Sequence, residues 1–495
     1  MRVVVKNYEL KLYIMSKYLY GAAVQGIQGF IFKTNELKHI VGASELVEQI
    51  CKSDFDEFAK NGEYVVRAAG NIKFIFDRKE DCQKAVREFP KKVMTKAPGI
   101  TISQAVVAFD DGFGKAIDDL EALLKVQRNK PSHSVTSGLI GIKRANNTGL
   151  PVVCIKEKIF KDEPTLKKEG SQNVKGLCEK SFGKDALIEK KIAYNISDIT
   201  DKNDWIAIIH ADGNGLGKVV HVVGKQKEVF KEFSQKLDLA TKDAANHAFI
   251  FVSNKFKDKQ IIPIRPVVLS GDDMTVIIRG DLAIDYARAF ISAFEDKTKE
   301  HIGEILRDQH VFTEDKDYLT ACAGIAFIKS SYPFYYGYQL AEDLCREAKK
   351  DTKAIYGADT NYLPPSCMMF HKVQDSFIND YKDIVDRELT AKGDGLSFKA
   401  GPYYIHPQDS KRTIDNLINA SVLLNSENGD GIKSGIRNWI SLRLEDKSKA
   451  DQRKDRMLQI FKDEAAIKLL TNEDNKSCIA YDVLAYYTIL NQQTK

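Results

Sequence analysis

Apolar positions in the first third of the chain alternate between a two-residue and a roughly 3.6-residue period. The two-residue period is typical of half-buried strands, and the longer period is typical of amphipathic helices. The order of the segments is strand, helix, strand, strand, helix, strand, helix, which predicts a ferredoxin-like (βαββαβ) domain. The segments are Tyr18–Val24, Ser44–Lys60 (with Ser44 as its N-cap), Tyr64–Ala68, Ile72–Phe76, Asp81–Thr95, Ile100–Phe109 and Gly114–Lys125.

The same order of strands and helices recurs after residue 204. The expected strands are the apolar run before Asp212, then Ile261–Leu269, Met274–Ile278, Leu319–Phe327 and Cys367–Gln374, and the expected helices are Lys225–Lys255, Leu282–His301 and Tyr338–Lys350. We therefore predict an α+β protein with two ferredoxin-like palm (cyclase-type) domains.

The remaining segments differ from the two palms in composition and in hydrophobic pattern. Residues 131–203 are rich in charged and small polar residues, which indicates a connector with a solvated surface or a basic face for RNA. Four amphipathic stretches predict a helical C-terminal domain: Arg412–Asn425, Ile432–Leu444, Asp451–Ile467 and Cys478–Asn491. The predicted domains are a first palm (1–130), a connector (131–203), a second palm (204–385) and the C-terminal domain (386–495).

Composition narrows the class of protein. The chain has 495 residues, of which 43% are hydrophobic and 29% charged, with a net charge of +5, and these values are typical of a soluble globular protein that tolerates acidic partners. The eight cysteines form no CxxC pair, which disfavours a zinc ribbon or a disulfide framework. We find no leader or long apolar span, and we expect a cytoplasmic protein without membrane segments.

Candidate chemistry is concentrated in Ser270-Gly271-Asp272-Asp273, between two strand-like runs. Two apolar runs separated by so few residues predict a hairpin. Adjacent carboxylates at its tip repel each other unless a cation lies between them, and Mg²⁺ or Mn²⁺ prefers such clustered oxygen ligands. Asp and Gly are also ordinary turn residues, so this motif alone is equally consistent with a simple turn.

A third carboxylate follows another apolar run. Asp212 ends the run that starts at Trp205, and Gly213, Asn214, Gly215, Leu216 and Gly217 follow it. An acid at a strand end, followed by a glycine-rich turn and a helix N-terminus, favours metal-bound phosphate. In a palm, the first strand lies beside the hairpin, so Asp212 faces Asp272 and Asp273. Together the two motifs predict a nucleotide site.

Two further residues lie close to these motifs in the predicted fold. Lys349 is near the end of the helix that follows the last palm strand, where it either complements the helix dipole or binds a triphosphate. His210 precedes Asp212 by two residues and therefore shares its face of the strand. We interpret His210 as a core histidine rather than as a ligand.

The first palm lacks the acidic residues of the second. Aligning the repeats by sequence places Gln25 at the position of Asp212, and Asn71 and Ile72 at the positions of the two hairpin aspartates. Because the fold forms without the acids in one copy, their presence in the other indicates chemistry. We predict no metal or triphosphate at Gln25 and Asn71.

The chain resembles the polymerase-like large subunit of type III CRISPR effector complexes, a cyclic-oligonucleotide synthase family related to GGDEF cyclases. The resemblance covers most of the chain and lies in Gly26–Phe32, Gly42–Leu46, Ala211–Gly217, Gly271–Asp273, Leu340–Lys349, Met368–His371 and Gly401–Tyr403. Lys349 falls on the phosphate-binding lysine that ends the GGDEF signature. Ser270 stands where the family has its first glycine, and neither the N-terminal HD nuclease nor the cysteine pairs of that family are found.

The resemblance implies an ATP-dependent, antiviral nucleotidyltransferase that makes a cyclic oligoadenylate with two divalent ions on Asp212, Asp272 and Asp273. Gly213–Gly217, Ser270, Gly271 and Lys349 would bind the nucleotide, and guide or target RNA and CRISPR-type subunits would be partners. Two other functions fit the same residues. One is a non-catalytic, nucleotide-sensing and RNA-binding scaffold, and the other is a GGDEF-like homodimer that makes a cyclic dinucleotide.

Overall fold

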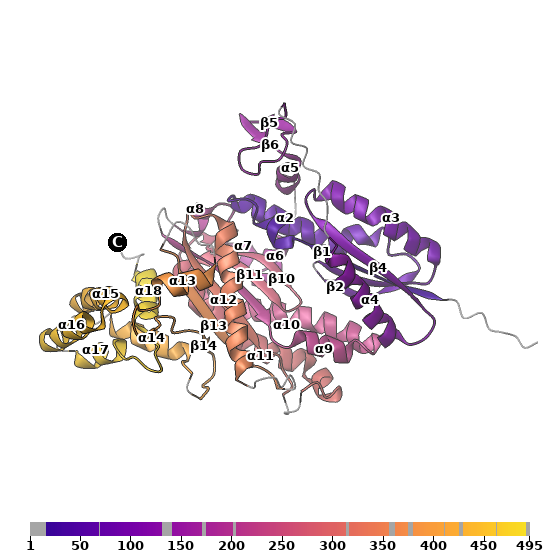
Figure 1. Cartoon of the computed structure of the whole chain (residues 1–495). Coiled ribbons are helices and arrows are strands. Elements are labelled where there is room, and N and C mark those ends of the chain that lie inside the picture. Colours follow the sequence, from indigo (N-terminus) through magenta and orange to yellow (C-terminus); the bar gives the residue numbers. More distant parts are fainter. Residues whose placement is uncertain are drawn as a thin grey trace, which may run out of the picture. The chain divides into compact units, whose positions relative to one another are not determined.

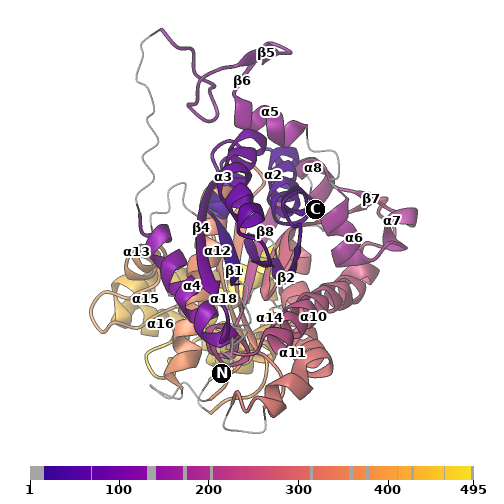
Figure 2. The same cartoon turned by 90° about the vertical axis from the view of Figure 1, so that its right-hand side faces the viewer.

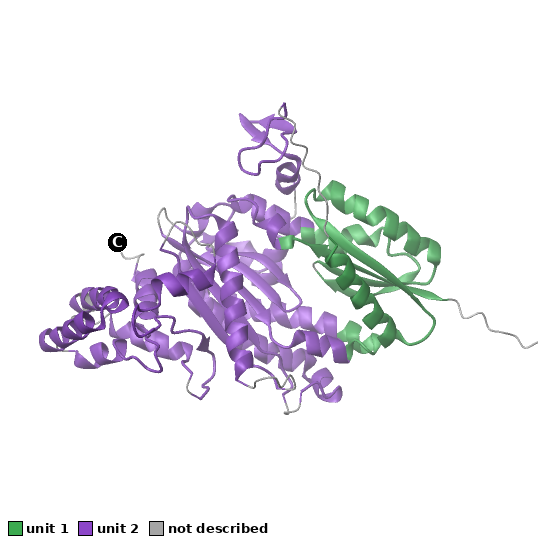
Figure 3. Cartoon of the chain, in the orientation of Figure 1, with its two compact units in different colours: residues 1–27, 47–139, 223–232 green, residues 28–46, 140–222, 233–495 purple. Residues whose placement is uncertain are grey.

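The computed structural model describes residues 16–68, 70–130, 141–170, 175–200, 204–312, 316–355, 362–374, 380–409, 411–424, 429–461 and 463–491. The chain divides into two compact units (Figure 3). The first comprises residues 1–27, 47–139 and 223–232, and the second comprises residues 28–46, 140–222 and 233–495. Each unit is built around one main sheet with helices packed on it (Figures 1 and 2).

The first unit contains a four-stranded antiparallel sheet in the order β2-β3-β1-β4. Phe55, Phe74, Phe76 and Phe89 lie in its core, where their rings contact one another. This order is that of a ferredoxin-like domain. Its elements are β1 Lys17–Gln25, β2 Gly62–Ala68, β3 Asn71–Phe76, α3 Lys79–Lys96, β4 Thr101–Phe109 and α4 Phe113–Arg128.

The strand register revises the alignment of the two repeats. Ala23 pairs with Asn71 in the first sheet, as Asp212 pairs with Asp273 in the second. Asn71 therefore corresponds to Asp273 rather than to the neighbouring aspartate, and Ala23, not Gln25, corresponds to Asp212. The sequence alignment was wrong by one residue at the hairpin and by two on the first strand, because only the pairing fixes the register. Neither Ala23 nor Asn71 carries a carboxylate.

The second unit contains a six-stranded sheet in the order β10-β11-β8-β12-β13-β14. Its first four strands repeat the order of the first unit, and β13 then adds parallel to β12. Thus the predicted α+β class with two ferredoxin-like palms is confirmed. Its six strands are β8 Trp205–Gly213, β10 Ile264–Ser270, β11 Asp273–Arg279, β12 Ala321–Lys329, β13 Cys367–Lys372 and β14 Tyr403–Tyr404, whereas β9 Ile261–Ile262 lies in a separate two-stranded sheet.

Helix α12 packs closely on one face of this sheet. A Cβ atom at Gly324 of β12 would lie 1.9 Å from the carbonyl oxygen of Ala341, so the glycine permits the close approach. Helix α12 extends past Lys350, where the sequence predicted its end, and Lys349 therefore lies within the helix. The main helices of this palm are α9 Leu216–Val223, α10 Lys227–Ser253, α11 Ala283–Asp308 and α12 Phe334–Ala354, with short 3₁₀ turns at Asn254–Phe256 and Gly280–Leu282.

Ser44 does not cap a helix, in contrast to the sequence prediction. Helix α2 starts at Leu37, and the Ser44 side chain lies within it and donates a hydrogen bond to the carbonyl of Val267. The apolar pattern begins earlier than the serine, so the helix begins earlier too. Helix α2 is Leu37–Gln49, it follows α1 Ile27–Ile31, and a π-helical turn Ile50–Asp54 continues it.

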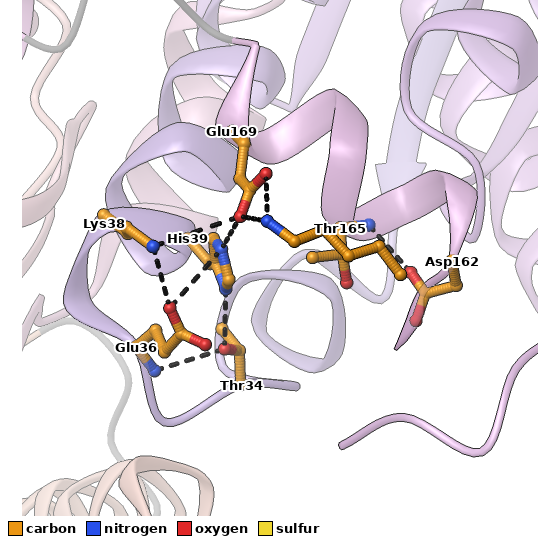
Figure 4. Close-up of polar contacts among 8 residues, drawn as sticks. Thr34, Glu36, Lys38, His39, Asp162, Thr165 and Glu169 are labelled. Atoms are coloured by element: carbon orange, nitrogen blue, oxygen red, sulfur yellow. Dashed lines mark hydrogen bonds and ion pairs between the residues drawn. The ribbon is translucent and has the colours of Figure 1, made fainter. Parts of the chain in front are cut away.

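The residues between the palms form small elements, and α5 is held to α2 by charged groups (Figure 4). His39 Nε2 lies 2.9 Å from Glu169 Oε1, and Lys161 donates to both carboxylate oxygens of Glu169 at 2.5 and 2.7 Å. These elements are β5 Cys154–Lys156, β6 Ile159–Lys161, α5 Glu163–Glu169, α6 Gly176–Phe182, α7 Ala186–Glu189, β7 Lys191–Ile192 and α8 Ile196–Ile199.

The C-terminal region is helical, as predicted, except that β14 joins the palm sheet by pairing with β13. Trp439 in this region is 1% exposed, and the helices nearest the C-terminus are yellow in Figure 1. The helices of this region are α13 Tyr381–Glu388, α14 Ile414–Leu423, α15 Gly429–Glu445, α16 Lys447–Ile460, α17 Glu464–Leu470 and α18 Ala480–Leu490. Within the ranges that the structure describes, none of the helices is long and apolar enough to span a membrane.

Candidate nucleotide site

Asp212 lies near the end of β8, the strand in the middle of the second palm. The strand before it is fully buried, and it is hydrogen-bonded on both sides. Asp212 is directly opposite Asp273 of β11 on one side and Cys322 of β12 on the other. The predicted adjacency of Asp212 and Asp273 is therefore observed in the strand register. The apolar strand fixes the position of Asp212 while its side chain remains 40% exposed.

Asp272 lies in the two-residue turn that joins β10 to β11. Ser270 pairs with Asp273 across this turn, and Gly271 adopts a positive φ of 64°, a conformation that glycine tolerates best. The hydroxyl of Thr241 in α10 donates to the Gly271 carbonyl and holds the turn. The hairpin thus places Asp272 and Asp273 on consecutive residues at the end of the sheet where Asp212 lies.

Gly213 allows Asp272 to approach β8. A Cβ atom at Gly213 would lie 2.9 Å from both Cβ and Oδ2 of Asp272. A larger residue there would push the Asp272 carboxylate away from Asp212, whose charge helps to raise the pKa of Asp272. The sequence assigned Gly213 to phosphate binding, and the structure adds this steric role.

Two of the three carboxyl groups, those of Asp272 and Asp273, have raised pKa values. Burial raises the pKa of Asp273 to about 8, with Asp212 adding to the shift and Lys349 opposing it. Burial, Asp212 and Asp273 raise the pKa of Asp272 well above its usual value. Two like charges brought together in a partly buried site require a cation to stay ionised. The site therefore has a deficit of positive charge.

Lys349 supplies one positive charge from α12. Its Nζ lies 2.5 Å from Asp212 Oδ2 and 2.7 Å from the carbonyl oxygen of Gly213. Burial opposes the charged form of Lys349, but Asp212 raises the pKa of its ammonium group above the ordinary value. Lys349 thus lies beside the aspartates, as the sequence predicted, and one ammonium group faces three carboxylates.

The rest of the glycine-rich loop has mixed roles. Asn214 is only 1% exposed, and its amide nitrogen donates to Thr320 Oγ1 at 3.1 Å and to Cys322 Sγ at 3.4 Å. This side chain therefore anchors the loop to the sheet. Gly215 has a positive φ of 74° at the start of α9, and a Cβ atom at Gly217 would meet no atom within 4 Å. Leu216 and Gly217 form the first turn of α9.

Two residues near Asp273 were not selected as site residues from the sequence. His210 Nδ1 lies 3.1 Å from Thr275 Oγ1 and 3.4 Å from Asp273 Oδ1, and burial lowers its pKa. Glu342 of α12 adds negative charge that raises the pKa of Asp273. Glu342 precedes Lys349 by seven residues, which is two helical turns, so this spacing was a signal that could have identified it.

The carboxylate oxygens of this site suit a divalent cation. Asp273 Oδ1 is buried and accepts no hydrogen bond in the described structure, and the pKa values of Asp272 and Asp273 are raised. However, the described residues contain no group of three His, Cys, Asp or Glu side chains already arranged around one ion. The single coordination shell expected from the sequence therefore stays a prediction.

Comparisons with known proteins agree with this palm. Residues 205–355 match the family described as Cas10/Cmr2, second palm domain. A chain of the Csm1-Csm4 cassette in complex with cA4 matches with a TM-score of 0.59 at 13% identity, covering 96% of this chain and 70% of that chain. A chain of the cassette in complex with pppApA matches with a TM-score of 0.58 at 14% identity, covering 96% and 69%. No curated protein matches the chain.

The comparisons confirm the resemblance to the large subunit of type III CRISPR effector complexes, which was predicted from the sequence. The family match falls on the palm that contains Asp212, Asp272, Asp273 and Lys349. At 13–14% identity, the likeness to the solved structures establishes the shared fold.

Proposed function

We propose that the chain is a nucleotidyltransferase that converts ATP to a cyclic oligoadenylate second messenger in CRISPR-type antiviral defence. The observation that carries this proposal is the strand register, which puts Asp273 directly opposite Asp212 with Asp272 beside it. The raised pKa values of Asp272 and Asp273, to which the charge of Asp212 contributes, support a shared cationic ligand.

In this proposal Asp212, Asp272 and Asp273 hold two Mg²⁺ or Mn²⁺ ions. When bound, such ions lower the pKa of an attacking ribose hydroxyl and neutralise the charge on the departing pyrophosphate. Lys349, once released from Asp212, binds the triphosphate as a point charge. The backbone of Gly213–Gly217, together with Ser270 and Gly271, surrounds the nucleotide.

The ligands named for similar proteins support ATP as the substrate. Chains of the Csm1-Csm4 cassette are known with AMPPNP, pppApA and cA4. These compounds correspond to a triphosphate substrate, a linear intermediate and a cyclic product. By the same reasoning we propose that this chain works with a Csm4-like partner subunit and with guide or target RNA.

A second candidate is a nucleotide-sensing scaffold that binds RNA without catalysis. The ion pair between Lys349 and Asp212 favours it, because this pair neutralises one ligand without any metal ion. In that case ATP would displace or contact Lys349 and no pyrophosphate would form.

Product analysis separates these functions. The protein, with Mg²⁺ or Mn²⁺ and RNA, is incubated with each labelled nucleoside triphosphate in turn, and the products are resolved by chromatography and mass. We expect pyrophosphate and a ring of adenylates from ATP alone. A cyclic dinucleotide would instead indicate GGDEF-like chemistry, and bound but unreacted ATP would indicate the scaffold.

A further inference from the structure

Two lysines lie over the indole ring of Trp205, at the other end of β8 from Asp212. Lys329 Nζ is 4.1 Å and Lys372 Nζ 5.0 Å from the centre of the ring. Trp205 pairs with Lys329 in the sheet, and Lys372 is on the next strand, on the same face. Seven residues separate Trp205 from Asp212, roughly 23 Å at about 3.3 Å per residue. The two regions are therefore separate.

Three donors at this end of the sheet, those of Trp205, Lys372 and Arg437, have no acceptor among the described side chains. Trp205 Nε1 is buried without a hydrogen-bond partner in the described structure. Among the described side chains, neither the Lys372 ammonium nor the guanidinium of Arg437 in α15 pairs with a carboxylate. Burial, Arg437 and Lys329 lower the pKa of Lys372 to about 8. Lys329 has a nearby carboxylate, that of Asp204, which raises the pKa of the lysine. Burial is the larger effect and lowers this pKa.

Other buried or partly buried lysines of the chain, such as Lys168 and Lys161, donate to an oxygen acceptor, whereas Lys372 does not within the described residues. Lys161 donates to both carboxylate oxygens of Glu169. Burying a cation without an anionic partner destabilises the folded state. The charges of Lys329 and Arg437 add repulsion to this cost. The unpaired cation therefore lowers the stability of the folded protein, and a bound anion would remove this destabilisation.

We propose that Trp205, Lys329, Lys372 and Arg437 form a binding site for a phosphate group, either free or in an RNA strand. A phosphate offers several acceptor oxygens to one indole N–H, two ammonium groups and a guanidinium, and arginine and lysine are the residues that proteins use for this anion. Arg437 is exposed and the two lysines are partly exposed, so an anion reaches them from solvent. The proposal does not depend on catalysis at Asp212.

Tryptophan fluorescence tests the site directly. The chain has two tryptophans, and Trp439→Phe leaves Trp205 as the only one. This variant is titrated with inorganic phosphate in one arm and with single-stranded RNA lacking a terminal phosphate in the other. We expect a saturable change in Trp205 fluorescence. A response to phosphate alone identifies a free anion as the ligand, and a response to RNA identifies a phosphodiester.

Lys372→Gln and Arg437→Gln, each in the Trp439→Phe background, should weaken binding at least about tenfold. For RNA, each should also reduce the slope of log affinity against log salt by about 0.7. The matched control is Lys468→Gln, because Lys468 is 62% exposed and pairs with Glu464. No fluorescence change with either ligand, or equal affinities for Lys372→Gln and the control, overturns the proposal.

Thermal unfolding distinguishes a binding site from a packing role. Without ligand, Lys372→Met should unfold at the same or a higher temperature than the parent, because an unpaired cation has been removed. Phosphate should raise the melting temperature of the parent but not that of the variant. A lower melting temperature of Lys372→Met without ligand would instead show that Lys372 serves only to pack on Trp205.

Discussion

Replacing Asp273 by Asn should stabilise the protein in the absence of divalent metal. The structure places this carboxylate beside Asp212, with one buried oxygen that accepts no hydrogen bond in the described part of the chain. Asparagine keeps the size of the side chain and removes its charge. The repulsion between Asp273 and Asp212 should therefore disappear while the hairpin keeps its shape.

The magnitude follows from the pKa of Asp273, which burial raises from 3.8 to about 8. A carboxyl whose pKa is raised by folding contributes stability below its unfolded pKa, and this contribution is lost as pH rises from about 4 to about 8. A difference of about four pH units corresponds to about 5 kcal/mol. Because 33% of the Asp273 side chain is exposed, solvent screening should reduce the effect to about 1–2 kcal/mol.

Thermal unfolding between pH 5 and pH 8.5 measures this effect. At pH 8 without metal, Asp273→Asn should melt about 2–4 °C above the wild type, and its stability should change less with pH. Saturating Mg²⁺ should reverse the order, since a ligand at 100 times its Kd stabilises by about 2.7 kcal/mol. The control is Asp308→Asn, an exposed acid at the end of α11. An Asp273→Asn protein that is less stable without metal, or equally stabilised by Mg²⁺, would refute the reasoning.

Three further predictions concern single residues. Lys349→Ala should weaken ATP binding about 10- to 100-fold in equilibrium binding, as expected for a charge-assisted contact, and an equal loss in Lys350→Ala, whose lysine is 79% exposed, would contradict it. Asn71→Ala should leave ATP binding and product formation unchanged, and lost turnover with an intact fold would show that the first palm takes part. Burial raises the pKa of Asp482 from 3.8 to about 7, so wild-type stability should fall between about pH 4 and pH 7 by at most about 4 kcal/mol. Asp482→Asn should remove that fall in urea unfolding, and an unchanged pH profile would contradict the assignment.

The strands and helices of both palms could be predicted from the sequence because their apolar periodicity is strong. The strand carrying Asp212 is buried on both faces, and the hairpin strands carry long apolar runs. Such patterns identify an element without knowledge of its tertiary contacts. The adjacency of Asp212 and Asp273 then follows from the palm topology.

Side-chain partners could not be predicted in the same way. Ser44 looked like a helix cap, yet it lies inside α2 and binds the Val267 carbonyl, a contact across 223 residues that local sequence does not encode. Asn214 looked like a phosphate ligand, yet its amide nitrogen binds Thr320 and Cys322. The alignment of Gln25 with Asp212 failed because register is set by strand pairing, which the glycines alone did not fix.

The most direct test of the proposed function is the Asp272→Ala, Asp273→Ala double variant in the assay with labelled ATP, Mg²⁺ or Mn²⁺ and RNA. The two residues lie at a hairpin end, and replacing them removes like charges that repel each other without metal, so the variant should fold normally by circular dichroism. Loss of the metal ligands should remove several kcal/mol of transition-state stabilisation. We predict that the wild type forms pyrophosphate and a cyclic adenylate and that the double variant forms neither. Full turnover by the folded double variant, under conditions where the wild type is active, would contradict the assignment of the second palm as the active site.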